Sequence, residues 1–269
     1  MANVLSEPLL ENVASMSSQV HVERTKQPVS QLALDAKAAA EANPYDPELW
    51  IKYGRALRRQ SMHREAIDAY AMGISYNPFY PLLYRHKAHA YINTGRYAEA
   101  AADFEFALRL DPTNVDCWYH LALSYFLLED YQRAEATYKK CYTMSDEDLD
   151  VISCTDWLWM TLRRLGKKEE AEKLLERITP NMEPGMVVSY HRRLLMYKGL
   201  IKPEELMTDA PNDLEVVTMG FGLANYYYEL GQEEKGNAMI LRVLEAGKED
   251  AWSAFGYQAA LVEKKRRNL

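Results

Sequence analysis

The sequence contains few cysteines and few helix-breaking residues, and it has no long apolar run. Its 269 residues include 3 cysteines, 11 prolines and 12 glycines. No run of about 18 apolar residues occurs, so no membrane span is predicted. No Lys or Arg precedes Arg24, whereas a secretory signal needs a basic start followed by an apolar run. We therefore expect a folded chain located in the cytoplasm.

The cysteines do not form a recognisable framework. Cys117, Cys141 and Cys154 are odd in number and show no CxxC spacing. Such a set does not predict a disulfide scaffold, and it fits a reducing compartment better. We expect the three thiols to be small core residues.

Signatures of catalysis and of nucleic-acid binding are also missing. The sequence has no GxSxG and no HExxH motif. Asp146, Asp148 and Asp150 resemble the start of a calcium loop, but Val151 and Trp157 stand where that loop needs Gly and Glu. The net charge of −7 argues against nucleic acid as a partner. We predict no enzyme, no cofactor, no metal, and neither a nucleic-acid nor a membrane partner.

Three histidines could in principle meet at a metal. His86 and His89 are one helical turn apart, and His120 follows His86 by one repeat period of 34 residues. No carboxylate or thiol is placed to complete the ligand set of a metal. A metal site and a polar lining of a binding surface are the two alternatives, and we favour the lining.

The sequence does contain a period of 34 residues, which indicates a repeat architecture. The positions that recur three times include Trp50, Tyr84 and Trp118; Pro44, Pro78 and Pro112; Ala66, Ala100 and Ala134; and Tyr70, Phe104 and Tyr138. Within a unit the apolar residues are three and four apart, which predicts two helices, and the proline ends the second. Small residues recur where two helices must approach closely, at Gly54, Ala88 and Ala122.

This pattern resembles the tetratricopeptide repeat over residues 47–146. The resemblance implies an all-α fold, a right-handed α-α superhelix of about twelve or thirteen helices without a sheet. Before the first unit, Leu32, Ala36 and Ala39 keep the register of a second helix, which predicts half a repeat. Residues 1–28 show no period and are expected to be disordered. The predicted regions are thus 1–28, a regular part at 29–146, and a divergent part at 147–269.

After residue 146 the register slips by three residues. Residues 162–178 and 220–244 still resemble repeat units, 186–207 predicts a full first helix with a short second one, and 249–267 predicts a capping helix. The basic end of that helix suits a helix C-terminus better than a nuclear-import signal. This half also weakly resembles repeat lipoproteins of the bacterial envelope. Their lipobox cysteine and signal are missing here, so their location is not carried over.

In tetratricopeptide-repeat proteins the first helix of each pair lines the concave surface, and this resemblance assigns the candidate site. The assigned residues are Lys52, Arg55, Arg58 and Arg59, then Arg85, His86, His89 and Asn93, then Tyr119, His120, Leu123 and Phe126. The face changes from cationic to aromatic and apolar along the array. Because arginine pairs well with carboxylates, we predict a protein or peptide partner with acids beside a hydrophobic residue. A solvated charged face is the structural alternative.

Some repeat proteins bind chaperone C-termini through a clamp of Lys, Asn, Asn, Lys and Arg. The corresponding positions here hold Ile51, Arg55, His86, Asp116 and His120. The clamp is not matched, so chaperone binding is not predicted.

The sequence thus predicts a protein-interaction module, an adaptor or scaffold that binds its partner in the concave groove. One alternative is a structural or self-associating scaffold with a closed groove. The least favoured alternative is an enzyme with a site in the atypical 180–212 region. The identity of the partner and the oligomeric state do not follow from the sequence.

Overall fold

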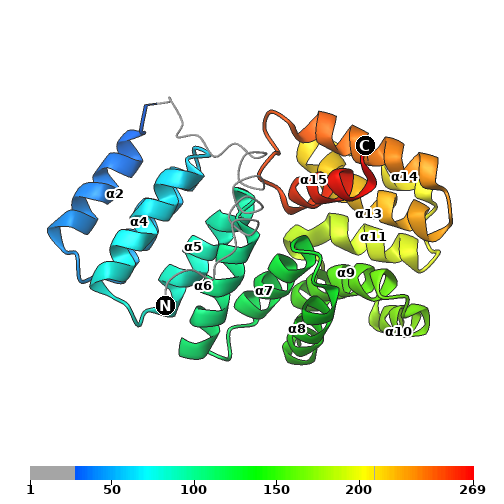
Figure 1. Ribbon diagram of the computed structural model, residues 1–269, viewed down its shortest axis with the longest axis horizontal. Coiled ribbons are helices and arrows are strands. Elements are labelled where there is room, and N and C mark those ends of the chain that lie inside the picture. Colours follow the sequence, from blue (N-terminus) through cyan, green and yellow to red (C-terminus); the bar gives the residue numbers. More distant parts are fainter. Residues whose placement is uncertain (1–27, 209) are drawn as a thin grey trace, which may run out of the picture. The chain divides into compact units, whose positions relative to one another are not determined.

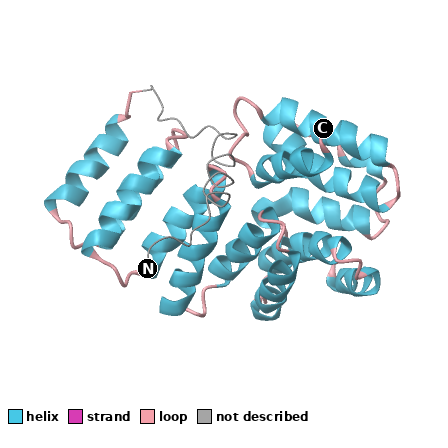
Figure 2. Cartoon of the chain, viewed as in Figure 1, coloured by secondary structure: helices cyan, strands magenta, loops and turns pink. Residues whose placement is uncertain are grey.

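The computed structural model describes residues 28–208 and 210–269, which fold into helices joined by turns and loops (Figures 1 and 2). As the repeat pattern predicts, no strand occurs within these ranges. None of the described helices is long and apolar enough to cross a membrane. The chain divides into two compact units, of which the first ends at Asn114 and the second begins at Val115. The segment predicted to be disordered, 1–28, lies outside the described residues except for Pro28.

The first unit consists of helices that pack on one another in chain order. They are α2 (Gln31–Ala42), α3 (Pro47–Arg58), α4 (His63–Tyr76), α5 (Pro81–Asn93) and α6 (Tyr97–Leu110). Pro47 and Pro81 begin their helices, where the missing N–H loses no intrahelical hydrogen bond. The side chains of Ser30 and Asp46 cap α2 and α3 by accepting hydrogen bonds from backbone N–H groups of the first turn.

The positions that recur every 34 residues form the cores of the units, which confirms the predicted period. The side chains of Ala66, Tyr70, Ala100, Phe104, Ala134 and Tyr138 are fully buried. The small-residue position is confirmed as well, because a Cβ on Gly54 would overlap the ring of Tyr70. Ala88 and Ala122 are also fully buried.

We expect Gly54→Leu to lower the free energy of unfolding by about 1–3 kcal/mol, because the added side chain must displace the Tyr70 ring from a filled core. Urea unfolding measures the change. Ala98→Leu, at an exposed position of α6, is the control and should stay within about 0.5 kcal/mol of the parent. A cost at Gly54 no larger than that of the control would contradict the packing.

Helix α2 is the predicted half-repeat, but it buries a different face. Ala33 and Ala40 are fully buried, whereas Leu32 is 57% exposed. One period later, Ala66 is buried because α4 packs against α3, the first helix of its own pair. No such first helix precedes α2 among the described residues. The face of α2 that carries Leu32 is therefore open.

The second unit contains the remaining helices. They are α7 (Val115–Leu127), α8 (Tyr131–Met144), α9 (Asp148–Arg164), α10 (Lys168–Leu174), the 3-10 turns Leu175–Arg177 and Gly185–Val187, α11 (Val188–Tyr197), α12 (Pro203–Leu206), α13 (Asp213–Glu229), α14 (Glu233–Gly247) and α15 (Phe255–Arg267). Helices α9, α11 and α13 pack in sequence, and α15 packs on α13, α14 and α7. The predicted short second helix at 186–207 is α12, and the predicted capping helix is α15.

The prediction for the cysteines is wrong for two of the three. Cys141 near the end of α8 and Cys154 in α9 are joined by a disulfide, while Cys117 is free. All three are buried, as expected. The turn between α8 and α9 brings the two linked side chains together, a tertiary contact that their separation of 13 residues does not reveal. The cysteines therefore give no support for a reducing compartment.

Candidate interaction site

Three of the predicted cationic residues line one hollow on the first unit. It has a volume of about 350 Å³ and is lined by Lys52, Arg55, Ala56 and Arg59 of α3 and its end, and by Leu32, Asp35 and Ala36 of α2. We call it the basic hollow. Lys52, Arg55 and Arg59 are exposed, and none of them has an ion-pair partner in the described parts of the chain. Asp35, the acid among the lining residues, accepts a hydrogen bond from Gln31 at 2.7 Å.

Arg58, also predicted for this surface, is engaged inside the first unit. Its Nη2 atom lies 2.8 Å from Nδ1 of His89 and 3.2 Å from Oδ1 of Asn93. Burial lowers the pKa of Arg58, and the neighbouring positive charge of Arg85 adds to this effect while Tyr70 opposes it. The side chain thus links α3 to α5, so Arg58 is a structural residue and not an exposed donor as expected.

The predicted residues of α5 lie together on one helix. Arg85 and His86 are half-buried, and Nη1 of Arg85 lies 3.1 Å from Nδ1 of His86. His89 and Asn93 contact each other at 3.0 Å and complete the network with Arg58. His86 and His89 thus make polar contacts within the first unit, and their place in the lining of a binding surface stays a prediction. Across residues 28–208 and 210–269, no group of three potential metal ligands is placed to hold an ion.

The apolar end of the predicted surface differs from expectation. His120, Leu123 and Phe126 of α7 are buried in the second unit. Phe126 packs edge-on against Trp157 of α9 at 5.2 Å, and His120 meets Phe255 of α15 at 5.5 Å. The unit folds its own later helices over this face of α7, so Leu123 and Phe126 are not accessible to a partner.

Tyr119 is the predicted residue of α7 that does reach a hollow. This hollow, which we call the apolar pocket, has a volume of about 250 Å³. Its lining residues are Tyr119, Ser153, Met186, Val187, Ser189, Tyr190, Leu214, Glu215, Thr218 and Phe255. The hydroxyls of Tyr119 and Tyr190 share a hydrogen bond, and the hydroxyl of Ser189 donates to Glu215. The pocket thus includes part of the atypical 180–212 region.

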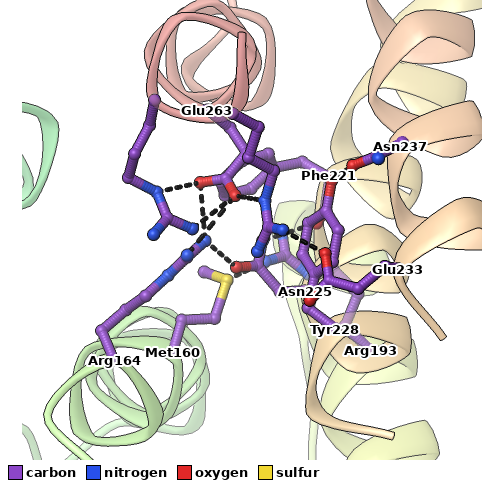
Figure 3. A network of polar contacts seen from close by, with 11 residues as sticks. Met160, Arg164, Arg193, Phe221, Asn225, Tyr228, Glu233, Asn237 and Glu263 are labelled. Atoms are coloured by element: carbon purple, nitrogen blue, oxygen red, sulfur yellow. Dashed lines mark hydrogen bonds and ion pairs between the residues drawn. The ribbon is translucent and has the colours of Figure 1, made fainter. Parts of the chain in front are cut away.

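The basic end of α15 is bound to the rest of the second unit, which sequence reasoning missed. Glu263 of α15 is 3% exposed and accepts hydrogen bonds from Arg164 of α9 at 2.8 Å and from Arg266 at 2.6 Å (Figure 3). Arg267 bonds to Glu263 and also to Glu233 of α14. Burial by itself would raise the pKa of Glu263, but the charge of Arg164 and the hydrogen bonds from Arg266 and Arg267 lower it to about 2. Glu263 therefore ties α15 to α9, and Arg267 ties it to α14.

Comparison with known proteins identifies the kind of repeat. A model of the tetratricopeptide repeat matches residues 86–148, which span α5 to the start of α9. The chain therefore contains tetratricopeptide-repeat sequence over these residues. Among solved structures similar to this repeat protein, a tetratricopeptide repeat protein from Parabacteroides merdae has a TM-score of 0.55 at 17% identity, covering 95% of this chain and 98% of the other. The Cut9–Hcn1 complex has a TM-score of 0.57 at 14% identity, covering 96% of this chain and 49% of the other. They support the fold of the repeat protein.

Relatives of this repeat protein resemble it over a part of their own length. Anaphase-promoting complex subunit 3 of Schizosaccharomyces pombe is 21% identical over 195 residues, which are 70% of this chain and 28% of that protein. The heat-shock protein cognate co-chaperone sgt12 of Aspergillus fumigatus is 33% identical over 87 residues, which are 32% of this chain and 26% of that protein. The repeat protein thus matches about a quarter of the length of these two relatives.

Proposed function

We propose that this repeat protein is an interaction module whose first unit binds an acidic segment of a partner protein in the basic hollow. Three exposed cations, Lys52, Arg55 and Arg59, support this proposal, because they line one hollow and have no ion-pair partner within residues 28–208 and 210–269. Arginine forks pair with carboxylates in bidentate geometry, and a lysine adds a point charge. The hollow is therefore suited to two or more carboxylates.

The exposed face of α2 supplies the apolar part of this proposed site. Leu32 lines the hollow and is 57% exposed. A partner segment with an aliphatic residue beside its acids could cover Leu32 while the acids meet Arg55 and Arg59. Leu32 thus takes the role that the sequence assigned to Leu123 and Phe126.

The relatives favour a protein partner over a small molecule. One relative is named as a co-chaperone, and another as the Hsp70-Hsp90 organizing protein 2 of Arabidopsis thaliana. The residues at the chaperone-clamp positions of this chain differ from that clamp, as Ile51 and Asp116 illustrate. We therefore propose an acidic segment in general as the bound ligand, and not a chaperone C-terminus.

We expect Arg55→Glu with Arg59→Glu to weaken binding of an acidic probe at least about tenfold at low salt, because two favourable charge contacts become repulsive. The probe is a fluorescein-labelled peptide with the core Glu-Leu-Glu-Glu, titrated by fluorescence anisotropy. Binding to the parent chain should also weaken as salt is added. Both substituted side chains are exposed, so the unfolding midpoint should change little.

Arg109→Glu is the control, since it makes one Arg-to-Glu change at an exposed position of α6 outside the hollow. It should leave the affinity for the probe within about twofold of the parent, because isolated surface charges contribute little. Equal affinities of the parent and the Arg55, Arg59 double variant at low salt would remove the basic hollow as the binding site.

A second candidate function, a closed structural scaffold, is favoured by a specific feature of the second unit. Helix α15 packs on α7, α13 and α14, and Glu263 ties it to α9 through Arg164. The unit covers much of its own inner face, as the buried Leu123 and Phe126 indicate. In this reading the second unit is a rigid structural element and not a binding surface.

A further inference from the structure

The apolar pocket of the second unit has the features of a second binding site. Two of its lining side chains are large and unusually exposed, Met186 at 90% and Leu214 at 52%. The rings of Tyr119, Tyr190 and Phe255 also line it. Its volume of about 250 Å³ is smaller than the roughly 300–1,000 Å³ of pockets that hold drug-sized ligands. The pocket therefore has the size to take one bulky side chain.

Most of the pocket wall comes from stretches of sequence that carry acids and no base. None of the stretches 115–132, 145–162, 178–191 and 203–234, which supply all of the lining residues except Phe255, contains Lys or Arg. Glu215 lies in the pocket wall, and Asp213 precedes it in the first turn of α13. Asp148 and Asp150 lie in the first turn of α9, one turn before Ser153. Arg193 contacts Tyr190 and Thr218 of the lining, but it is fully buried and its charge is paired with that of Asp156. A cation next to the pocket would therefore meet the acids of these stretches.

Some of these acids are close enough to one another to interact. Burial raises the pKa of Asp150, and the negative charges of Glu147 and Asp116 raise it further. Asp116 belongs to α7 and Asp150 to α9, so acids of two helices gather at one end of the unit. Acids at helix N-termini also stabilise their helices. Stabilisation of helix N-termini by acids does not explain the exposed apolar side chains of the pocket or the hollow itself.

We propose that the apolar pocket binds a bulky apolar side chain of a partner peptide that carries Arg or Lys beside it. The aromatic and aliphatic lining takes the apolar side chain, and Glu215 and its acidic neighbours take the base. The hydroxyl of Ser189 holds the carboxylate of Glu215 in the pocket wall. This site has the opposite charge preference to the basic hollow, so the chain would bind two segments of different chemistry on its two units.

The test uses a fluorescein-labelled peptide with the core Arg-Phe-Arg, a version with Ala in place of Phe, and a version with Glu in place of both Arg. Fluorescence anisotropy gives the affinities for the full chain. The Phe-to-Ala change should weaken binding at least about tenfold, because the buried ring is lost. Leu214→Ser should weaken binding of the parent peptide several-fold. Leu241→Ser, which removes a leucine of similar exposure on α14 outside the pocket, should not.

Charge is tested separately. Glu215→Gln keeps an acceptor for the Ser189 hydroxyl and should weaken binding of the Arg-Phe-Arg peptide about threefold to tenfold. The same variant should bind an uncharged analogue, with Gln in place of both Arg, as well as the parent chain does. The Arg55, Arg59 double variant should bind the Arg-Phe-Arg peptide as well as the parent chain does, so failure of the basic hollow and failure of this pocket are distinguishable. No saturable binding at millimolar peptide, or an affinity unchanged by both Leu214→Ser and Glu215→Gln, would overturn the proposal.

Discussion

Asp156→Ala is expected to lower the free energy of unfolding by about 3–5 kcal/mol, because it leaves the buried Arg193 without a counter-charge. Both side chains are 0% exposed, and Nη2 of Arg193 lies 2.9 Å from Oδ2 of Asp156. Burial raises the pKa of Asp156, although the charge of Arg193 opposes this effect. Burial by itself would lower the pKa of Arg193, but the charge of Asp156 together with Tyr197 and Tyr190 raises it. We take the pair as charged, because a buried guanidinium does not release its proton.

The contacts of Arg193 explain why replacing only one residue of the Asp156–Arg193 pair should destabilise the fold. Its Nη1 atom donates to the backbone oxygen of Thr218 at 3.1 Å, and its guanidinium lies over the ring of Tyr190 at 5.2 Å. A Cβ on Gly222 would overlap the Nε atom of Arg193, so the glycine makes room for the side chain. The pair thus joins α9, α11 and α13 at the centre of the second unit.

A double-mutant cycle measures the coupling. Arg193→Met should also be strongly destabilising, but Asp156→Ala combined with Arg193→Met should cost less than the sum of the two single changes, because no unpaired charge remains. Urea unfolding gives the free energies, and Lys168→Met with Glu169→Ala, two exposed residues of α10, is the control. Additive costs of the two single changes would show that the residues do not interact.

Glu263→Gln is expected to cost about 3 kcal/mol at pH 7, the value of a carboxyl pKa lowered from 4.5 to about 2. The pKa is lower in the folded state, so the folded chain holds the proton less tightly than the unfolded one. The stabilisation is therefore complete above about pH 4.5 and is lost as the pH falls from there to about 2.

The pH dependence separates this role from simple packing. The difference in unfolding free energy between the parent and Glu263→Gln should shrink as the pH is lowered from 5 toward about 2, where the carboxyl of the parent is protonated as well. Glu234→Gln, at an exposed position of α14, should show no such difference at any pH. A cost of Glu263→Gln that is constant over this range would contradict the electrostatic account.

The regular part of the fold could be predicted because the residues that determine it lie close together in the sequence and recur in every repeat. The positions of Ala66 and Tyr70 recur at a fixed spacing, and the side chains at both are fully buried in every unit. The short helix α12 in the divergent part was also predictable, because its apolar pattern is short and a polar stretch comes after it. The open face of α2 was missed because Leu32 has the right register, and only the structure shows that the helix needed to cover it does not precede α2.

The candidate site was only partly predictable, because exposure depends on contacts between residues far apart in the sequence. Arg58 and Arg59 are neighbours, yet Arg58 turns to His89 of the next first helix while Arg59 lines the basic hollow. His120 is covered by Phe255, which follows it by more than a hundred residues. The pairing of Asp156 with Arg193 likewise has no local signal, since each lies among apolar residues that alone predict a helix.

The central claim, that the basic hollow recognises acidic segments, is tested most directly by selecting a random peptide-display library on the full chain and on its Arg55→Glu, Arg59→Glu variant. The account predicts that the parent chain enriches peptides with acids beside an aliphatic residue, and that the variant loses this class. The Arg109→Glu control should enrich the same class as the parent. Selection of the same acidic peptides by the parent and the double variant, or no enrichment of acids by the parent, would contradict the claim.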